Sequence, residues 1–242
     1  MLRRKISDLS PDRFKVLACT WNGLNDSIGG LLYIAKFFET NSLNFNNIHF
    51  SHLAYKNLDT YFNFNGVEYV KEPVFEDYNF VARLNNGTLT RSFSTTQINK
   101  FISIKENLVE EGSIFKNYIG VQFRHYKSEF VKTTDPDRDR IFTAEVQEYA
   151  QRFLARYSPS ENYLIVSDNP IWCDFFKDKK NITYLVVPEP MVTPFEHIRE
   201  RYLGFSVTQI CALAACRKIY TTHGSFHDLT RLISDKIPKE KL

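Results

Sequence analysis

The pattern of hydrophobic and polar residues predicts strands and helices that alternate along the second half of the chain. Short apolar segments at 119–124, 162–167 and 182–187 are predicted as strands, the first half-buried and the second buried. Amphipathic or apolar stretches at 142–157 and 207–216 are predicted as helices. This alternation is typical of an α/β protein, in which helices cover both faces of a parallel sheet.

The remaining elements of the second half are shorter. Pro170 is expected to open a short helix, because proline suits the first helical turn. A strand is predicted at 218–222 and a last helix at 226–235, with the turn THGSF between them. A polar loop is expected over 126–140, where the sequence ends in DPDRDR.

The first half is less regular. Strands are predicted at 14–19 and 47–51, and a helix at 31–39. A turn is expected at Asn65-Gly66, and 98–111 has the pattern of a helix. We therefore expect two domains, an irregular first half over 1–100 and a clearer second half over 101–242.

A glycine-rich segment, TWNGLNDSIGG, follows the first predicted strand. It contains neither G-x-G-x-x-G nor G-K-[ST], so the dinucleotide fingerprint and the P-loop are both excluded. Gly23, Gly29 and Gly30 would allow close backbone approach to a ligand, and Asn25 would offer a neutral hydrogen-bond donor. The alternative is that these glycines only shape a tight turn and let the next helix pack.

Composition narrows the class of protein. The chain has 242 residues, of which 43% are hydrophobic and 24% charged, as in an ordinary globular protein. Its net charge of +3 does not indicate a nucleic-acid-binding protein. The four cysteines form no C-x-x-C pair and no zinc spacing, and two of them, Cys211 and Cys216, are predicted to be buried thiols.

We expect neither a secretory signal nor a membrane span. The N-terminus MLRRKISDLSPDR has no apolar segment behind it, unlike a secretory signal. The longest apolar run, 210–216, is too short to span a membrane. We therefore expect a reduced, cytoplasmic location and no transmembrane segment.

Polar groups follow three predicted strands of the second half, and in a parallel sheet these ends share the edge where ligands bind. Arginine is the informative residue, because its planar fork can clasp two phosphate oxygens at once. Gly224-Ser225 would present backbone N–H groups at a helix N-terminus, which is an anion site. The three groups are Arg124-His125, Ser167-Asp168 and Thr222-His223-Gly224-Ser225.

Each of these groups also has a purely structural reading. Arg124 and its neighbours could be a solvated charge cluster at a strand end. Ser225 could cap the helix that follows, and Asp168 could initiate the helix at Pro170. Their coincidence on one sheet edge favours the functional reading.

Four motifs together resemble the superfamily of nodulation, α1,2-, α1,6- and protein-O-fucosyltransferases. The family's H-x-R-R/H strand end is similar to QFRH at 122–125, and its S/T-D strand end is similar to 167–168. Its apolar helix, short strand and S-S-F turn resemble ICALAACRKIYTTHGSFHDLTRLIS, with Phe226 closing the turn. Its Gly/Asn-rich loop resembles NGLNDSIGGLL, around Gly23 and Asn25. The resemblance covers nearly all of 14–234.

The resemblance implies a GT-B fold, in which two Rossmann-like halves with parallel sheets face a cleft. The first half would hold a glycan acceptor and the second a GDP-sugar, most readily GDP-fucose, as co-substrate, with no metal and no other cofactor. Arg124 would stabilise the β-phosphate of the leaving GDP. Asp168 would lie near guanine or ribose, and Ser225 and Phe226 near the phosphates and the sugar.

The sequence also departs from the family pattern. Gln122 stands where many members have His, and Tyr126-Lys127 replace a small and an acidic residue. The first half is short, and little chain follows the last predicted helix. An inverting transfer needs a base for the acceptor proton, for which Asp26, Glu129 and His125 are all candidates.

Two other readings stay open. Asp135-Pro136-Asp137 and Asp137-Arg138-Asp139 match the D-x-D of metal-dependent glycosyltransferases, although no buried strand precedes them and the arginines favour a solvated loop. The chain could also be a non-catalytic sugar- or nucleotide-binding protein on the same scaffold.

Overall fold

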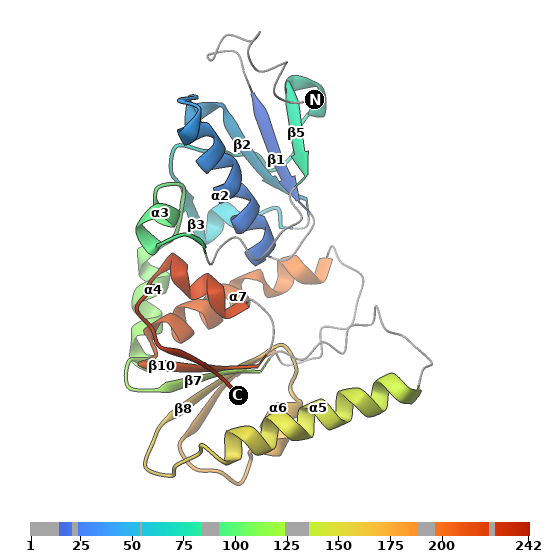
Figure 1. The fold of residues 1–242 in the computed structure, drawn as a ribbon, viewed down its shortest axis with the longest axis vertical. Coiled ribbons are helices and arrows are strands. Elements are labelled where there is room, and N and C mark those ends of the chain that lie inside the picture. Colours follow the sequence, from blue (N-terminus) through green and yellow to red (C-terminus); the bar gives the residue numbers. More distant parts are fainter. Residues whose placement is uncertain are drawn as a thin grey trace. The chain divides into compact units, whose positions relative to one another are not determined.

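The computed structural model describes residues 15–20, 24–53, 55–83, 92–123, 136–187, 197–222 and 226–242. The chain divides into two compact units (Figure 1). Unit 1 comprises Met1–Lys105 with Arg231–Asp235, and unit 2 comprises Glu106–Thr230 with Lys236–Leu242.

Unit 1 is built on a parallel sheet with the strand order β4-β2-β1-β5. Its strands are β1 (Val16–Thr20), β2 (Ile48–His52), β4 (Glu68–Tyr69) and β5 (Phe80–Arg83). All five residues of β1 are buried, because β2 and β5 pair with it on either side and helix α2 (Leu24–Thr40) packs against it. The strands predicted at 14–19 and 47–51 are thus confirmed within two residues.

The glycine-rich turn was predicted wrongly. Helix α2 begins at Leu24, so Asn25, Gly29 and Gly30 lie inside the helix and are buried there. A glycine inside a helix costs about 1 kcal/mol relative to alanine. Burial of the apolar residues that surround the glycines, such as Ile28 and Leu32, outweighs this cost, at about 1.5–3 kcal/mol for each side chain.

The rest of unit 1 is made of short elements. Strands β3 (Phe62–Phe64) and β6 (Ile102–Ile104) form an antiparallel pair, and Ser94 and Gln97 make a capping box at the start of α3 (Thr95–Asn99). Among the described residues, 3-10 helices connect the strands: η2 (Phe45–Asn47), η3 (Leu58–Thr60) and η4 (Phe75–Asp77).

The turn predicted in this region is present, but the predicted long helix is not. The expected turn is present, with Gly66 at a φ of 67°, but its flanking strands do not pair with one another, because β3 pairs with β6 and β4 with β2. The helix predicted over 98–111 is wrong, since α3, β6 and α4 share that stretch.

Unit 2 is built on a five-stranded parallel sheet with the order β11-β10-β7-β8-β9. Its strands are β7 (Ile119–Phe123), β8 (Tyr163–Ser167), β9 (Ile182–Val186), β10 (Lys218–Thr221) and β11 (Lys239–Lys241). Its helices are α4 (Glu106–Gly112), η6 (Ser113–Phe115), α5 (Pro136–Leu154), α6 (Ile171–Phe175), α7 (His197–Ala215) and η8 (Phe226–Leu232), the last of which continues into unit 1.

Helices cover both faces of this sheet, as the alternation predicted (Figure 1). Val121 and Phe123 of β7 pack with residues of α5 and α6, including Phe153 and Trp172. Alternate positions point the other way, so that Leu164 and Val166 of β8 pack with α7. The α/β class with parallel sheets is therefore confirmed.

Two glycines let α7 lie close to its neighbours. A Cβ on Gly120 of β7 would come within 2.8 Å of Leu213 and 3.2 Å of the Cys216 sulfur. A Cβ on Gly112, at the end of α4, would lie 2.7 Å from the backbone of Cys211. The sheet, α7 and α4 therefore form one closely packed stack.

The boundaries of several unit 2 elements differ from the predictions. Helix α5 starts at Pro136, inside the predicted loop, since proline lacks only an N–H that the first helical turn does not use. Helix α7 starts ten residues before the predicted 207. The last helix is the shorter 3-10 helix η8, and the sequence analysis missed β11 entirely.

Candidate functional site

The carboxyl ends of four parallel strands lie side by side in the second sheet. The register pairs Thr221 with Gln122, and Phe123 with Ser167. Ser167 in turn pairs with Val186. Strands β10, β7, β8 and β9 thus end at one edge, which is where open α/β sheets bind ligands. The three strands that carry the predicted motifs are direct neighbours in the sheet.

Only part of the predicted site lies within the described residues. The predicted site residues outside the described ranges are Gly23, Arg124, His125, His223, Gly224 and Ser225. The predicted site residues within them are Asn25, Asp168, Thr222 and Phe226. The ligand contacts assigned to all ten residues stay predictions, and the geometry below concerns the elements that carry them.

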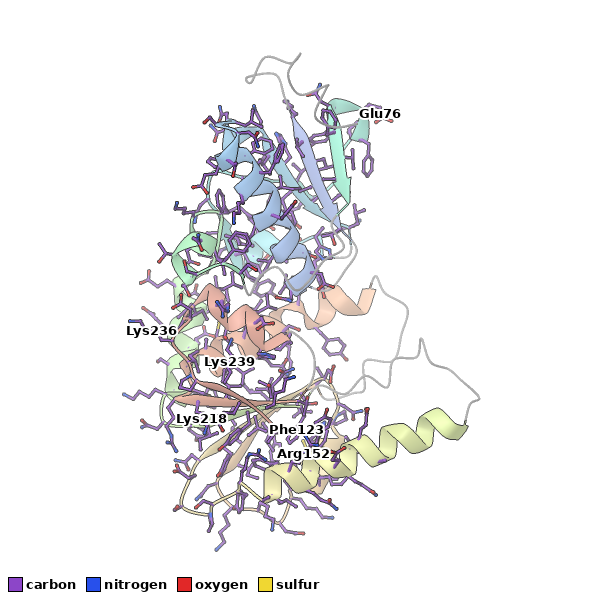
Figure 2. All side chains as sticks on the ribbon, viewed as in Figure 1. Glu76, Phe123, Arg152, Lys218, Lys236 and Lys239 are labelled. Carbon is purple, nitrogen blue, oxygen red and sulfur yellow. The ribbon has the colours of Figure 1, made fainter. Side chains whose placement is uncertain are left out.

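The end of β7 is held by aromatic packing on one face of the sheet. The Phe123 ring is fully buried and stacks on Trp172, with the ring centroids 3.9 Å apart and the planes 10° from parallel. Phe153 and Phe176 pack around it at 5.9 and 5.7 Å. Figure 2 labels Phe123 in the second unit. Phe123 is the last residue of β7, so this cluster fixes the residue directly before Arg124 in the sequence.

A hydrogen bond holds the same strand end on the opposite face. The Gln122 side chain is buried, and its Oε1 lies 3.1 Å from Nδ1 of His227 in η8. The Gln122 carbonyl accepts hydrogen bonds from both the backbone N–H and the hydroxyl of Thr222, at 3.1 and 3.3 Å. Thr222 therefore ties the ends of β10 and β7 together, and the Gln122 amide oxygen points to the protein rather than to solvent.

The end of β8 forms a tight turn around Asp168. The Ser167 hydroxyl accepts a hydrogen bond from the Asn169 N–H at 3.1 Å. Asn169 Oδ1 accepts one from the N–H of Ile171 at 3.0 Å. Asn169 thus makes a hydrogen bond at the start of α6, next to Asp168, which is half-buried. The reading of Asp168 as the residue that initiates the helix stays a prediction.

Gln209 of α7 holds this strand end by two hydrogen bonds. Its side chain is buried, and its amide nitrogen donates to the Ser167 carbonyl at 3.0 Å and to the Leu185 carbonyl at 2.7 Å. One side chain therefore fixes β8 and β9 to α7 at the edge of the sheet. The sequence analysis missed Gln209, Asn169 and His227. A polar residue within an apolar helix, as Gln209 is, signals a buried partner but does not identify it.

The first sheet also has polar groups at the carboxyl end of β1. The Ser27 hydroxyl, in α2, donates to the Thr20 hydroxyl at 3.3 Å, and both side chains are buried. Asn25 is buried in the first turn of α2, while Asp26 beside it is half-buried. Asp26 is the one candidate base among the described residues, because Glu129 and His125 lie outside them.

Cys211 of α7 and Cys216, which directly follows that helix, are poor nucleophiles. Burial raises the pKa of both Cys211 and Cys216 to about 12, so both are thiols rather than thiolates at neutral pH. This confirms the prediction of buried thiols in the chain.

Within the described ranges, no three His, Cys, Asp or Glu side chains gather to hold an ion. Asp137 and Asp139 of the D-x-D pattern lie in the first turns of α5, not in a loop as predicted, and no described strand leads directly into them. In that same part of the chain, none of the helices is long and apolar enough to cross a bilayer.

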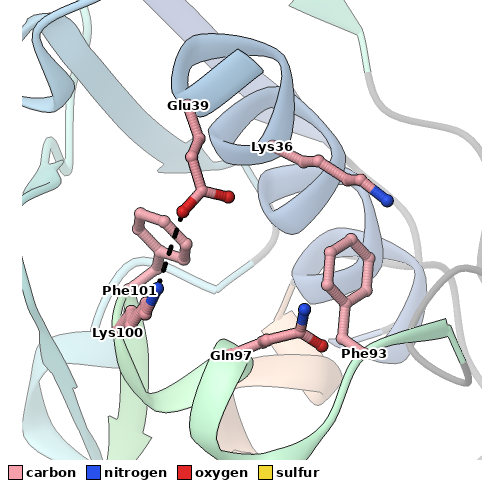
Figure 3. Close-up of a pocket in the computed structure, with 6 residues that line it drawn as sticks. All are labelled: Lys36, Glu39, Phe93, Gln97, Lys100 and Phe101. Carbon is pink, nitrogen blue, oxygen red and sulfur yellow. Dashed lines mark ion pairs between the residues drawn. The ribbon is translucent and has the colours of Figure 1, made fainter. Parts of the chain in front are cut away.

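A separate hollow of about 70 Å³ occurs in unit 1 (Figure 3). Phe93, Gln97, Lys100 and Phe101 line one side, and Lys36 and Glu39 of α2 line the other. The Lys100 and Glu39 side chains form an ion pair at 3.5 Å across it. The hollow has room for only a few water molecules, which is too little for a sugar ring.

Comparisons with known proteins identify the fold. No protein-family model matches the chain, and no curated protein has a matching sequence. Solved structures do match. NodZ α-1,6-fucosyltransferase co-crystallised with GDP superposes with a TM-score of 0.56 at 11% identity, over 92% of this chain and 93% of NodZ.

The chain has the fold of NodZ fucosyltransferase. A NodZ crystal soaked with GDP-fucose gives a TM-score of 0.55 with the same coverage and identity. A mutant of FUT1 from Arabidopsis thaliana in complex with GDP gives 0.54 at 10% identity, over 95% of this chain and 70% of FUT1. The resemblance inferred from four short motifs is thus confirmed at the level of the fold.

Proposed function

We propose that the protein is a glycosyltransferase that transfers a sugar, most readily fucose, from a GDP-sugar to a glycan acceptor. The observation that carries this proposal is the likeness of fold over 92% of the chain to a fucosyltransferase crystallised with GDP and with GDP-fucose. The motifs at the carboxyl edge of the second sheet add support, because their strands are adjacent and parallel.

In this proposal unit 2 holds the donor and unit 1 the acceptor. Arg124 follows the rigidly packed Phe123 and contacts the β-phosphate of GDP. Negative charge grows on that phosphate as the bond to the sugar breaks, so a bidentate cation stabilises the transition state more than the ground state. The turn that carries Asp168 faces guanine or ribose, and the segment from Thr222 to Phe226 faces the phosphates and the sugar.

The transfer inverts the anomeric centre and needs no metal ion, because Arg124 and the backbone N–H groups near Ser225 neutralise the leaving diphosphate. A base then takes the proton of the acceptor hydroxyl. Asp26 fits by its position at the start of α2, after the carboxyl end of β1, while Glu129 and His125 stay alternatives. The proposed location is the cytoplasm.

Ligand-dependent thermal stability tests the proposal. A ligand that binds only the native state at a hundred times its Kd stabilises it by about 2.7 kcal/mol. We expect GDP and GDP-fucose to raise the Tm of the protein and UDP-sugars to leave it unchanged. Stabilisation by UDP-sugars but not by GDP would contradict the donor assignment.

Turnover separates an enzyme from a binding protein on the same fold. Release of GDP from GDP-fucose, measured with a mixture of glycan acceptors, should exceed the rate without protein and should persist in EDTA. GDP binding without any release would instead support a non-catalytic protein, and loss of activity in EDTA would support the metal-dependent reading.

A further inference from the structure

We propose that His227 is a positioning residue, which acts through Gln122 to hold the carboxyl end of β7 in place for the bound donor. The inference deepens the proposed function and rests on it, because the placement of that strand end matters for turnover only if a nucleotide binds there. The contact joins residues 105 positions apart, and no sequence motif contains both.

The contact itself is built like a specific buried hydrogen bond. His227 Nδ1 and Gln122 Oε1 are 3.1 Å apart, and the Gln122 side chain is almost inaccessible to solvent. A buried amide oxygen accepts, so the Nδ1 of the ring carries the proton in this contact. A buried polar group that loses its partner is left with its desolvation uncompensated, which strongly favours keeping the pair formed.

His227 is itself held from several sides. Its backbone carbonyl accepts hydrogen bonds from the Thr230 hydroxyl at 2.8 Å and from the Lys239 Nζ at 3.0 Å. Its Nε2 lies 3.5 Å from Asp228 Oδ1, and the Asp228 side chain is only 5% exposed. η8 and the Lys239 side chain of β11 thus present the ring to β7 in one orientation.

The two faces of the sheet together restrain β7 at its last two residues. On one face Phe123 stacks on Trp172 at 3.9 Å, and on the other Gln122 bonds to His227 at 3.1 Å. Thr222 adds a third restraint, since it donates twice to the Gln122 carbonyl. The Gln122–His227 bond is the one of these that also reaches η8, the element that follows the predicted phosphate-binding turn.

This arrangement assigns a role to Gln122, which stands where many members of the fucosyltransferase superfamily have His. Its amide oxygen is committed to the protein, so we assign Gln122 to positioning and not to recognition of the base or sugar. A displacement of about 1 Å at a catalytic group can cost a hundredfold in rate. Loss of the pair should therefore lower kcat more than it raises KM.

The test uses three variants of the full chain with GDP-fucose and the acceptor mixture: Gln122→Met, His227→Phe and the double substitution. Each keeps the approximate volume but removes the hydrogen bond. We expect each single variant to lower kcat by about tenfold or more while KM for GDP-fucose changes less. The double variant should be no worse than the poorer single variant, because the two residues act as one unit.

Two further variants separate positioning from general stability. His227→Asn places an amide nitrogen near the position of Nδ1 and should restore most of kcat. Tyr163→Phe is the matched control. It removes the bonds of a buried hydroxyl to Ser158 and Arg156 at the opposite end of β8, so it should lower Tm and leave kcat intact.

Unchanged kcat in well-folded Gln122→Met and His227→Phe would overturn the inference. So would equal losses of kcat in the Tyr163→Phe control. If the wild-type protein neither binds GDP nor releases it from GDP-fucose, the proposed function fails on its own. Amide hydrogen exchange then still tests the pair: Gln122→Met should accelerate exchange at both 119–127 and 220–228, and unchanged exchange would refute the contact.

Discussion

Replacement of Gln209 by methionine should loosen the edge of the second sheet without leaving a cavity. The side chains have similar volumes, but methionine cannot donate to the Ser167 and Leu185 carbonyls, which lie 3.0 and 2.7 Å from the amide nitrogen. Each hydrogen bond contributes about 1 kcal/mol net. The Ser167 carbonyl keeps a bond from the Val187 N–H, so it is not left without a donor.

We therefore expect Gln209→Met to lower the free energy of unfolding by about 1–2 kcal/mol. This corresponds to a fall in Tm of roughly 2–8 °C for a chain of this size. The same change should weaken GDP binding about threefold to tenfold, equivalent to at most about 1.4 kcal/mol. The reason is that Asp168 follows directly after Ser167, whose carbonyl the clamp holds.

Calorimetric titration with GDP and urea denaturation of the same samples measure both effects. Thr208→Ala is the matched control, because Thr208 is the exposed neighbour of Gln209 in α7 and bonds only to the Gly204 carbonyl in its own helix. Thr208→Ala should change neither the free energy of unfolding nor the free energy of GDP binding by more than about 0.5 kcal/mol. A Gln209→Met protein with wild-type stability, or one that loses stability but binds GDP unchanged, would refute the corresponding part of this reasoning.

Further predictions concern packing, pH and metal. Gly112→Ala should destabilise the protein by about 1–2 kcal/mol in urea denaturation, because overpacking against the Cys211 backbone costs more than the gain in helix propensity. The control Ser113→Ala changes an exposed residue and should leave stability unchanged. Burial raises the pKa of Cys216 from 9 to about 12, so folding favours the thiol, and its contribution to stability is complete below pH 9 and is lost as pH rises towards 12. Urea denaturation at a series of pH values should show this alkaline loss of stability. The free energy of unfolding of Cys216→Ala should fall less steeply with pH, and identical slopes for the two proteins would contradict the prediction. GDP release from GDP-fucose should keep its rate in EDTA, and a rate restored only by added Mn²⁺ or Mg²⁺ would contradict the proposed metal independence.

Most of the second sheet could be predicted from the sequence because its strands are apolar. β7 and β8 are buried throughout, although the alternation at 119–124 predicted only a half-buried β7, and β9 is partly buried. β7, β8 and β9 are short, nearly continuous apolar segments bounded by polar turns, and their predicted limits agree with the structure within one residue. β11 could not be predicted in this way. Its three residues, Lys239–Lys241, are polar, and pairing with β10 alone makes them a strand.

The start of α2 shows how packing can override local signals. Gly29 and Gly30 are typical of a turn, yet they lie inside the helix that begins at Leu24, where the apolar side chains on either side of them are buried. Local sequence signals are also insufficient to predict the contacts of the site. The partners of Gln122 and Ser167 are His227 and Gln209, which only the completed sheet brings within hydrogen-bonding distance.

The kcat for GDP release by Arg124→Ala, measured beside its Tm, tests the central claim most directly. If Arg124 stabilises the leaving diphosphate, kcat should fall by about a hundredfold or more. Arg124→Lys should lose less, because it keeps the charge but not the bidentate geometry. The Tm of both variants should stay close to that of the wild-type protein. A well-folded Arg124→Ala variant with unchanged kcat would contradict the proposed use of the second sheet as the site of sugar transfer from GDP.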